Sequence, residues 1–410
     1  MNAPRPGQKQ SLRILWVKLG GLWPPNVGGR VRTFRTLEQL SRRHRLSLVT
    51  THAPHEDPGP LPQALPDCTE VSSLAFAAPK VGSREFVTSL LRSWASRYPV
   101  DLWRWRVPQL RRLLAERMER ERFDVCVADF LTALPNLPAM PGIPLVLFEH
   151  NVEHHIWRRL AGSERRPWAR LPLAGEWRKM RMYERQACRM ANLTLTVSRH
   201  DQRALQQLAP GSRIEAVPTG VDTDYFVPSS GPQQACHLVF TGAMDWYPNE
   251  EGMRWFLSTI WPRVRADFPE VTLTVVGRNP APAFRAFADA EGAYVTGTVD
   301  DIRPHVWPAT VYVVPIRIGG GTRLKIFEAM AMGKAVVSTR VGAEGLPIRP
   351  ETHYLCADSA ADFAAAIGRL LRDVQKRARL EAAGRRLVVQ HHSWPHVAAD
   401  FETRLRSVLH

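Results

Sequence analysis

The 410-residue sequence predicts an α/β protein with two domains, each built around a parallel sheet. Three observations predict this class. Short apolar runs alternate with helical stretches along the chain, the chain is longer than a single core usually supports, and a stretch rich in Pro, Gly and Ser interrupts the pattern near its middle. Hydrophobic residues make up 44% of the sequence and charged residues 23%, so both halves have enough apolar side chains for a core.

The apolar runs form one series on each side of the interruption. We expect strands in the first half at residues 13–17, 45–50, 124–129, 144–150 and 193–198, and in the second half at residues 237–242, 271–277, 294–297, 311–315 and 335–339. Each series is sufficient for a doubly wound, Rossmann-like domain. Two such domains facing each other form a central cleft at the carboxyl ends of their strands, where ligands usually bind.

The interruption, from Val217 to Pro232, sets the domain boundaries. We predict an N-terminal domain over residues 1–215, a linker over 216–234 and a C-terminal domain over 235–410. The last helix of the C-terminal domain is a candidate to cross back to the N-terminal domain.

Positive charge is concentrated in the N-terminal domain. The chain has a net charge of +16, and residues 1–215 contribute +15 of it, with 34 Lys and Arg against 19 Asp and Glu. Because a uniformly solvated surface would not divide in this way, we expect one half to face an anionic partner such as a membrane, a polyphosphate or a nucleic acid.

The five cysteines are scattered and form no Cys-x-x-Cys pair, which argues against a disulfide framework or a zinc ribbon. No apolar run approaches the ~18 residues of a membrane span, and the apolar stretch near the N-terminus is too short for a signal peptide. We therefore expect a cytoplasmic protein, with peripheral attachment to the inner face of the membrane as a further candidate location.

The most informative segment, residues 311–339, has the pattern strand, glycine loop, helix, strand. Gly319, Gly320 and Gly321 allow a ligand to approach the backbone closely, and Thr322 is a plausible N-cap of the helix. The first turn of that helix offers free N–H groups and the positive end of the helix dipole, which suit a diphosphate.

Charged side chains flank this helix start. Arg323 and Lys325 add cations for a diphosphate, and Glu328, about one and a half turns into the helix, places a carboxylate where ribose hydroxyls would lie. Leu324, between the two cations, belongs to the candidate donor site, although helical spacing also places it on the core face. Gly333 is the expected C′ residue of the helix.

This segment resembles the donor-site signature of the large retaining glycosyltransferase family four, the group 1 glycosyl transferases of GT-B architecture. The resemblance covers almost the whole chain, through residues 25–32, 217–226, 240–249 and 341–346. It implies that a hexose moves, with retention of configuration, from a nucleotide-diphosphate sugar on the C-terminal domain to an acceptor on the N-terminal domain. The implied acceptor is a saccharide or a polyprenyl-linked saccharide, and the implied process is cell-surface or exopolysaccharide synthesis.

The resemblance also assigns residues outside the glycine loop. Gly28, Gly29 and Gly242 are implied to bind the donor, and His150, at the end of a predicted strand, is implied to lie near the donor sugar. The alternative for His150 is a strand-end histidine that is hydrogen-bonded to the backbone. Asn249 is expected to cap a helix, and a role at the cleft is the alternative. The nucleotide sugar is a substrate, and neither a cofactor nor a nucleic acid partner is implied.

Two departures from the family pattern concern the donor. The family usually carries two glutamates with seven residues between them; the second matches Glu328, but the first would fall at Gly320. The family also often has an Arg and a Lys after the first strand of the second domain, and the corresponding loop here contains neither. Arg317, Arg323 and Lys325 are candidates to replace them in binding the diphosphate.

Two patterns are similar to metal sites. Residues 150–154 fit the H-x-x-E-H pattern of zinc peptidases but follow a predicted buried strand instead of lying within a helix. Asp222 and Asp224 resemble a metal-binding aspartate pair, but they lie in the linker, where turn chemistry explains them. We expect no metal ion. The sequence leaves open a nucleotide-sugar epimerase on the same fold and, less favoured, a basic nucleic-acid-binding protein.

Two stretches combine arginine with tryptophan. Residues 84–122 place five apolar side chains at helical spacing, namely Phe86, Leu90, Leu91, Trp94 and Tyr98. Residues 155–189 interleave ten Lys or Arg with Trp157, Trp168 and Trp177. Tryptophan and arginine on amphipathic helices suit a membrane interface. The alternative is a set of helices that pack on the core and expose a basic face.

Overall fold

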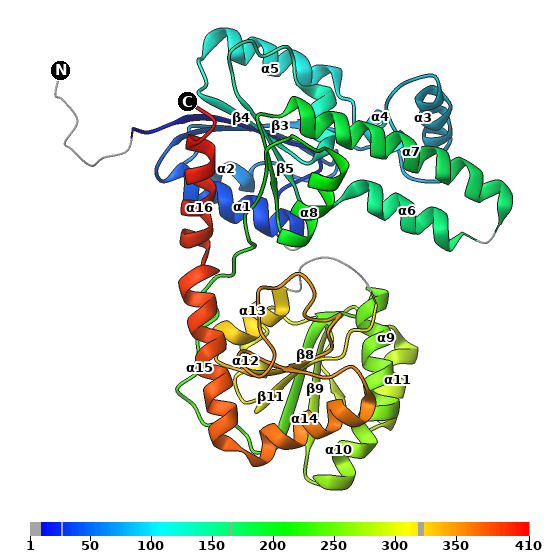
Figure 1. Cartoon of the computed structure of the whole chain (residues 1–410), viewed down its shortest axis with the longest axis vertical. Coiled ribbons are helices and arrows are strands. Elements are labelled where there is room, and N and C mark those ends of the chain that lie inside the picture. Colours follow the sequence, from blue (N-terminus) through cyan, green and yellow to red (C-terminus); the bar gives the residue numbers. More distant parts are fainter. Residues whose placement is uncertain (1–9, 26–27, 165, 319–323, 410) are drawn as a thin grey trace. The chain divides into compact units, whose positions relative to one another are not determined.

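A computed structural model of the chain describes residues 10–25, 28–164, 166–318 and 324–409. The chain divides into two compact units, which Figure 1 colours from blue to red along the sequence. The first unit comprises Met1–Pro218 and Val397–His410, and the second comprises Thr219–His396. Each unit is an α/β domain with a parallel sheet, so the predicted fold class is confirmed.

The first unit contains a seven-stranded parallel sheet in the order β3-β2-β1-β4-β5-β6-β7. Its strands are β1 (Arg13–Lys18), β2 (Arg45–His52), β3 (Glu70–Ala75), β4 (Val125–Asp129), β5 (Leu145–Glu149), β6 (Leu193–Thr196) and β7 (Ile214–Ala216). Because β1 pairs with both β2 and β4, the winding reverses between β1 and β4, and the carboxyl ends of these strands are where a doubly wound sheet binds ligands.

Helices cover both faces of this sheet (Figure 1). They are α1 (Gly28–Ser41), α2 (Pro60–Ala64), α3 (Arg84–Trp94), α4 (Val100–Trp103), α5 (Pro108–Arg120), the 3-10 helix η1 (Leu131–Asn136), α6 (Glu153–Ser163), α7 (Pro167–Met190) and α8 (Arg199–Leu208). Leu110 and Leu114 of α5 and Met180 and Ala187 of α7 pack with β1, β4 and β5 in one core cluster.

The C-terminal residues complete the first unit. They belong to α16 (Trp394–Arg406), whose residues from Val397 onward cluster with the first unit. Phe401 stacks on Trp16 of β1 with 5.5 Å between ring centroids and meets Phe148 of β5 edge-on at 5.1 Å. All three rings are buried, so this segment contributes part of the hydrophobic core on that face of the sheet.

The second unit contains a six-stranded parallel sheet in the order β10-β9-β8-β11-β12-β13. The strands are β8 (His237–Ala243), β9 (Thr272–Arg278), β10 (Tyr294–Val295), β11 (Val311–Val314), β12 (Ala335–Ser338) and β13 (Leu355–Cys356). Here the winding reverses between β8 and β11, which makes the carboxyl end of β8 the equivalent ligand position.

Two apolar layers enclose this sheet. The helices are α9 (Tyr247–Trp255), the π-helical turn η2 (Phe256–Ile260), α10 (Trp261–Asp267), α11 (Pro282–Ala290), α12 (Arg303–Val306), α13 (Leu324–Ala331), α14 (Ala360–Arg372) and α15 (Val374–His391). Phe256, Phe284 and Phe363 are buried on one face, and Phe327 and Met330 are buried on the other.

All ten predicted strands are present, with ends that differ by at most two residues. Three strands were not predicted. β3 alternates apolar residues with Glu70, Ser72 and Ser73 at a sheet edge, and β7 and β13 are only three and two residues long. Strands of that length give no readable period, so their pairing is decided by the sheet that they extend.

The segment predicted as a linker packs largely on the second unit. Val221 N donates to His392 O at 2.7 Å, and the indole N–H of Trp307 donates to Val227 O at 2.8 Å. None of the described helices combines the length and the apolar composition that a membrane span requires.

Candidate functional site

At the carboxyl end of β8, a lysine from another element lies against the backbone. Lys325, the second residue of α13, donates from Nζ to Asn249 Oδ1 at 2.9 Å, and its Nζ lies 4.1 Å from the centre of the Phe240 ring. A Cβ atom at Gly242 would lie 2.6 Å from Nζ and 2.7 Å from Asn249 Nδ2. Glycine is therefore required for the ammonium group to reach this strand end, where the loop sequence carries no cation of its own.

The prediction that Asn249 caps a helix is wrong. Helix α9 begins at Tyr247 with Trp246 in the extended cap position, because Pro248 is favourable in the first helical turn. Asn249 lies inside that turn, only 3% exposed, and donates from Nδ2 to Ala243 O at 2.8 Å. Its amide thus fixes the strand end on one side and the ammonium group of Lys325 on the other.

Glu328 lies three residues after Lys325, on the same side of α13. Burial raises the pKa of Glu328 to about 7, against the lowering effect of Lys325. The helix ends at Ala331, and Gly333 adopts φ +68° while Lys334 N donates to Ala329 O at 2.9 Å. The predicted C′ role of Gly333 is therefore confirmed.

The structure describes two of the other donor-site candidates in this unit, Arg317 and Leu324. Arg317 is ion-paired with Glu251, and its guanidinium lies 4.7 Å from the centre of the Trp255 ring, so it packs on α9. Leu324 is half-buried at the start of α13, whereas Phe327 belongs to the core. Gly320, Gly321, Thr322 and Arg323 lie outside the described residues.

In the first unit, a buried carboxylate gathers side chains at the carboxyl ends of β1, β4 and β5. Asp129, fully buried at the end of β4, accepts hydrogen bonds through Oδ2 from Thr33 Oγ1 at 2.6 Å and from the Trp16 indole at 3.0 Å. Its Oδ1 lies 3.0 Å from His150 Nε2 and 3.7 Å from Lys18 Nζ. Burial alone would raise the pKa of Asp129, but Lys18 and His150 hold it well below its usual range.

His150 has a defined tautomer in this network. Arg32 NH1 lies 3.1 Å from His150 Nδ1, and because a guanidinium only donates, Nδ1 accepts and the ring proton sits on Nε2, facing Asp129. Burial lowers the pKa of His150 to about 4, although Asp129 opposes the shift. The imidazole is therefore neutral, and both of its nitrogens face protein side chains.

The glycine pair at the start of α1 lies beside this network. A Cβ at Gly29 would lie 3.3 Å from the Phe130 ring and 3.8 Å from His150 Nδ1, while a Cβ at Gly28 would meet no atom within 4 Å. Phe130 stacks on His150 with 4.0 Å between centroids and has φ +70°, a strained value for a non-glycine residue. Backbone strain of this kind is typical of functional sites.

Phe130 also lines a cavity of about 160 Å³. Its polar walls are Asp101 of α4, which is ion-paired with the lining residue Arg104, Thr132 of η1 and Glu153 of α6, and Trp105 adds an aromatic wall. Burial and the neighbouring Glu184 raise the pKa of Glu153 to about 7. Carboxyl and hydroxyl groups beside an aromatic ring are suited to a ligand rich in hydroxyl groups.

Neither of the metal-like patterns assembles a metal site. His150 faces Asp129, whereas His154 Nδ1 is paired with Glu184 of α7. Asp222 Oδ1 accepts the backbone N–H of Tyr225 at 2.9 Å, which is the expected turn. Among the described residues, no three His, Cys, Asp or Glu side chains converge as metal ligands would.

Sequence reasoning missed the partners that hold these candidates. Asp129 stood at the end of a predicted strand, so the rule that strand ends carry functional residues would have found it. Lys18 and Arg32 flank the glycine-rich loop between β1 and α1, and their common target became visible only in the fold. Nothing in the local sequence linked Asn249 to Lys325, which is 76 residues away.

Two Rossmann-like units in one chain, each with polar groups at the strand ends where the winding reverses, define the GT-B class of two-domain proteins. Family models support this class directly. The model for glycosyltransferase family 4 matches residues 28–225, and the model for glycosyl transferases group 1 matches residues 235–373. The chain therefore belongs to the group 1 glycosyltransferases, and the predicted family resemblance is confirmed.

Curated relatives include mannosyltransferases. The phosphatidyl-myo-inositol mannosyltransferase of Mycobacterium tuberculosis is 32% identical over 213 residues, which are 48% of this chain and 55% of that protein. The MMP alpha-(1->4)-mannosyltransferase of Mycolicibacterium hassiacum is 27% identical over 330 residues, 76% of each chain. The match to the first relative thus spans about half of that protein's length.

Solved structures share the fold. Sucrose-phosphate synthase from Thermosynechococcus elongatus has a TM-score of 0.67 at 16% identity, covering 97% of this chain and 99% of its own. The Anabaena protein HepE, in complex with UDP and glucose, has a TM-score of 0.62 at 16% identity, covering 97% of this chain and 100% of its own. At this identity the likeness concerns the fold alone.

Proposed function

We propose that this chain transfers a hexose from a nucleotide-diphosphate sugar to a saccharide or lipid-linked acceptor, with retention of configuration and without a metal ion. The second unit binds the donor nucleotide, and the first unit binds the acceptor. Cell-surface or exopolysaccharide synthesis is the process in which such a product is used. The mannosyltransferase relatives make a mannosyl donor the first to test.

The position of Lys325 is the observation that carries this proposal. Its ammonium group lies at the carboxyl end of β8, the ligand position of this sheet, and is oriented by Asn249. The family often has an Arg and a Lys in the loop after this strand to bind the donor diphosphate, and the loop after β8 contains neither. Lys325 reaches this strand end from α13 because Gly242 leaves the space open. Together with Arg323, it would neutralise the leaving diphosphate, to which Gly320, Gly321 and Thr322 would offer backbone N–H groups.

Glu328 is proposed to accept the ribose hydroxyl protons of the nucleotide. Its carboxyl group lies about one turn beyond Lys325, which matches the order of diphosphate and ribose in a nucleotide. Burial raises the pKa of Glu328 to about 7. Ribose hydroxyl groups would donate hydrogen bonds to this carboxyl group and favour its ionised form. Arg317, which is paired with Glu251 of α9, is proposed to position the glycine loop that precedes α13.

In the transfer itself, the bond between the sugar and the diphosphate breaks while the acceptor oxygen bonds to the same face of the anomeric carbon. The leaving diphosphate accepts the acceptor proton. The contribution of Lys325 is electrostatic, because negative charge grows on the diphosphate oxygens as that bond breaks. No nucleophile of the protein is required in this scheme.

In the first unit, His150 is proposed to act as a positioning residue. Its Nδ1 holds Arg32 and its Nε2 faces Asp129, so the imidazole sets where the guanidinium lies relative to Gly28 and Gly29. The glycine pair leaves backbone N–H groups of the α1 start accessible to an anionic or hydroxyl group of a substrate. The cavity beside Phe130, with Thr132 and Glu153, is proposed to receive the acceptor saccharide.

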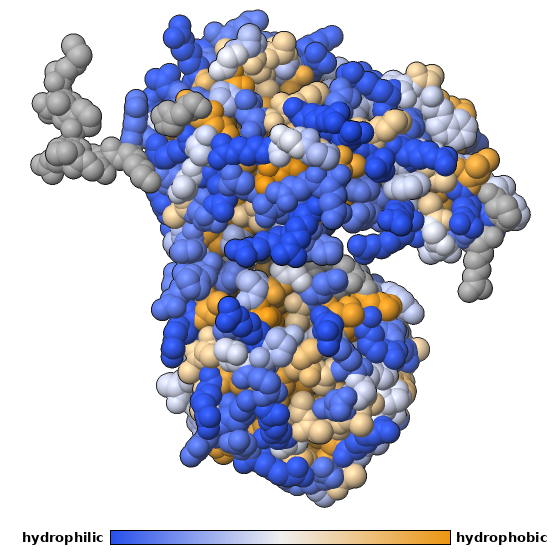
Figure 2. All heavy atoms as spheres, in the orientation of Figure 1, coloured by the Kyte–Doolittle hydropathy of each residue, from blue (hydrophilic) through white to orange (hydrophobic). Residues whose placement is uncertain are grey.

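The first unit is also proposed to attach to anionic membranes. Ten of the seventeen large hydrophobic side chains exposed in the described residues lie within residues 81–190, among them Leu91 (56%), Trp94 (53%) and Trp168 (73%). Figure 2 shows apolar and hydrophilic side chains interleaved on this side of the first unit. Exposed apolar residues among arginines fit an anionic lipid surface, which would supply a lipid-linked acceptor.

The test is product analysis with the full chain. GDP-mannose and UDP-glucose, each labelled in the sugar, are incubated with the protein and with membrane lipids or simple glycosides as acceptors. Transfer that gives an α-linked product from an α-linked donor supports the proposal. A sugar ring altered in configuration without transfer would identify an epimerase instead, and an inverted linkage would contradict retention.

A further inference from the structure

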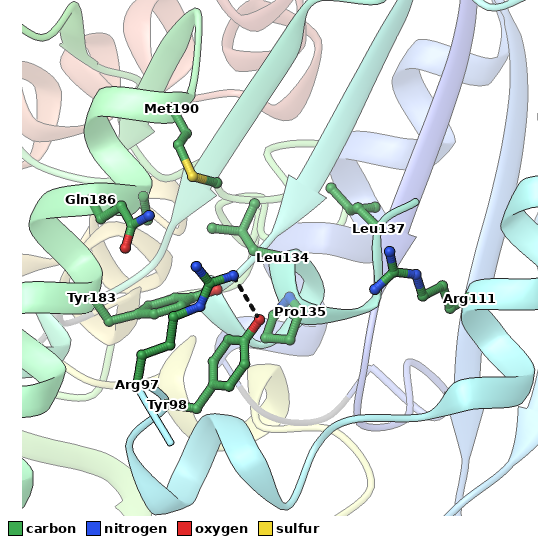
Figure 3. A pocket seen from close by; sticks show the side chains of 10 residues that line it. Arg97, Tyr98, Arg111, Leu134, Pro135, Leu137, Tyr183, Gln186 and Met190 are labelled. Atoms are coloured by element: carbon green, nitrogen blue, oxygen red, sulfur yellow. Dashed lines mark hydrogen bonds between the residues drawn. The ribbon is translucent and has the colours of Figure 1, made fainter. Parts of the chain in front are cut away.

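A second cavity in the first unit, of about 210 Å³, lies between α5, η1 and α7. Figure 3 shows its lining: Arg97 and Tyr98 precede α4, Arg111 belongs to α5, and Tyr183 and Gln186 belong to α7. Leu134, Pro135 and Leu137 form its apolar wall. The cavity shares no lining residue with the cavity beside Phe130.

The polar groups of this cavity favour an anion. Arg97 donates to the Tyr98 hydroxyl at 3.4 Å, and in Figure 3 its guanidinium lies next to Tyr183, with Arg111 on the opposite side. Neither Asp nor Glu lines the cavity. Tyr183 is only 9% exposed, and burial raises its pKa, so its phenol stays neutral and can donate a hydrogen bond. Two guanidinium groups and neutral donors are the partners that phosphate prefers.

Exposed apolar side chains lie on α7, which lines the cavity, and on α3, which contacts α7. Met190, a lining residue, is 54% exposed, and Met182 on the same helix is 63% exposed. Lys179 Nζ donates to Ser93 O at 2.6 Å, which ties α7 to the end of α3, where Leu91 and Trp94 are also more than half exposed. Helices α3 and α7 therefore present large apolar side chains to their surroundings.

We propose that this cavity binds the phosphate group of an anionic membrane phospholipid, with Arg97 and Arg111 contacting the phosphate and the exposed side chains of α3 and α7 entering the lipid interface. This proposal rests on the membrane attachment of the first unit and names the site at which it is specific. A free phosphate compound would use the two arginines but would gain nothing from the exposed apolar side chains of α3 and α7, so these side chains favour a lipid as the occupant.

The experiment compares two pairs of charge-removing substitutions in the full chain. Arg97→Gln with Arg111→Gln removes the cavity arginines, and Arg92→Gln with Arg112→Gln removes two exposed arginines near them that do not line it. Binding is measured by co-sedimentation with vesicles of phosphatidylcholine and phosphatidylglycerol in equal parts, and with phosphatidylcholine alone. Glycerol 3-phosphate serves as the soluble probe, and calorimetric affinity for GDP and UDP reports on the second unit.

The cavity pair should weaken vesicle binding roughly tenfold more than the control pair, because only the cavity pair loses directed contacts as well as charge. Tyr183→Phe, which keeps the ring, should weaken it by a smaller factor. Equal loss in both pairs would overturn the cavity site and leave only diffuse attraction. Tight binding of glycerol 3-phosphate without vesicle binding would overturn the lipid as its occupant. If the unmodified chain has no measurable affinity for GDP or UDP, that result would instead count against the proposed transferase function.

Discussion

The two units share a sheet topology but bury charge very differently. Among the described residues, the first unit buries eight Lys, Arg, Asp or Glu side chains, including Lys18, Arg32 and Asp129, whereas the second unit buries only Lys334. Lys334 is satisfied by two backbone carbonyls, of Trp307 and Ala309. Buried ion pairs rarely increase stability over apolar packing, so the first unit gives up stability to hold charges in place.

This difference matches the tasks proposed for the units. A nucleotide diphosphate is much the same in every reaction of this class, and one cation with a glycine loop and a helix start can bind it. An acceptor differs from enzyme to enzyme and needs hydroxyl-specific groups on a rigid support. The network around Asp129 provides such support, because each of its side chains restrains another.

The largest effect should come from breaking this network. Asp129→Asn leaves Lys18, which is 3% exposed, without its carboxylate, so the first unit should lose about 3 kcal/mol of unfolding free energy. Hydrogen exchange followed by mass spectrometry measures the two units separately. The exposed substitution Asp67→Asn is the control. An equal loss of protection in the second unit would contradict the confinement of this network to the first unit.

Removing the cation of the second unit should affect activity more than folding. Lys325→Ala is expected to lower kcat/KM by about 10²–10³-fold, the usual cost of losing one group that stabilises developing charge. The melting temperature should change little, since Lys325 is only part-buried. Arg340→Ala removes an exposed cation from the same unit and should leave activity intact. Near-normal kcat/KM in the Lys325 variant would exclude it from the diphosphate site.

Glu328→Gln should separate stability from binding. The pKa of Glu328 is raised from its ordinary value of 4.5 to about 7, so ionisation of this carboxyl group disfavours the folded state, and that cost develops between pH 4.5 and 7. The glutamine variant should therefore melt higher than the native chain at pH 8, with little difference at pH 4.5. Its affinity for the preferred nucleotide should fall roughly tenfold. Unchanged calorimetric affinity would show that Glu328 has no contact with the ribose.

The smallest expected effect is that of chelation. The diphosphate would be neutralised by Lys325, Arg323 and a helix start, so initial rates with the true donor should survive exhaustive EDTA treatment. Added magnesium should stimulate turnover modestly at most. Complete loss on chelation, restored by metal, would mean that Asp222, Asp224, Asp300 and Asp301 must be reconsidered as ligands.

Local sequence patterns were sufficient for ten of the thirteen strands and for turns that depend on a glycine or an aspartate, since period and residue type carry that information. The C′ position of Gly333 and the turn at Asp222 are examples. Patterns failed where a side chain's partner is distant in the chain. Asn249 is of a residue type that often caps helices, yet its position in the helix is set by Pro248 and its side chain bonds to Lys325. In the same way, Arg97, Arg111 and Tyr183 meet only because α5 and α7 cover the same face.

The contribution of Phe401 to the first unit has a consequence for synthesis on the ribosome. Trp16 and Phe148 emerge early in synthesis. Phe401, whose ring packs against both of them, follows the entire second unit in chain order. The second unit has all its strands before that ring appears, so it can fold while the first still exposes an apolar face. That face is the surface on which a nascent-chain chaperone would act, and stop codons placed just before Val397 should yield chains that bind nucleotide yet aggregate through their N-terminal half.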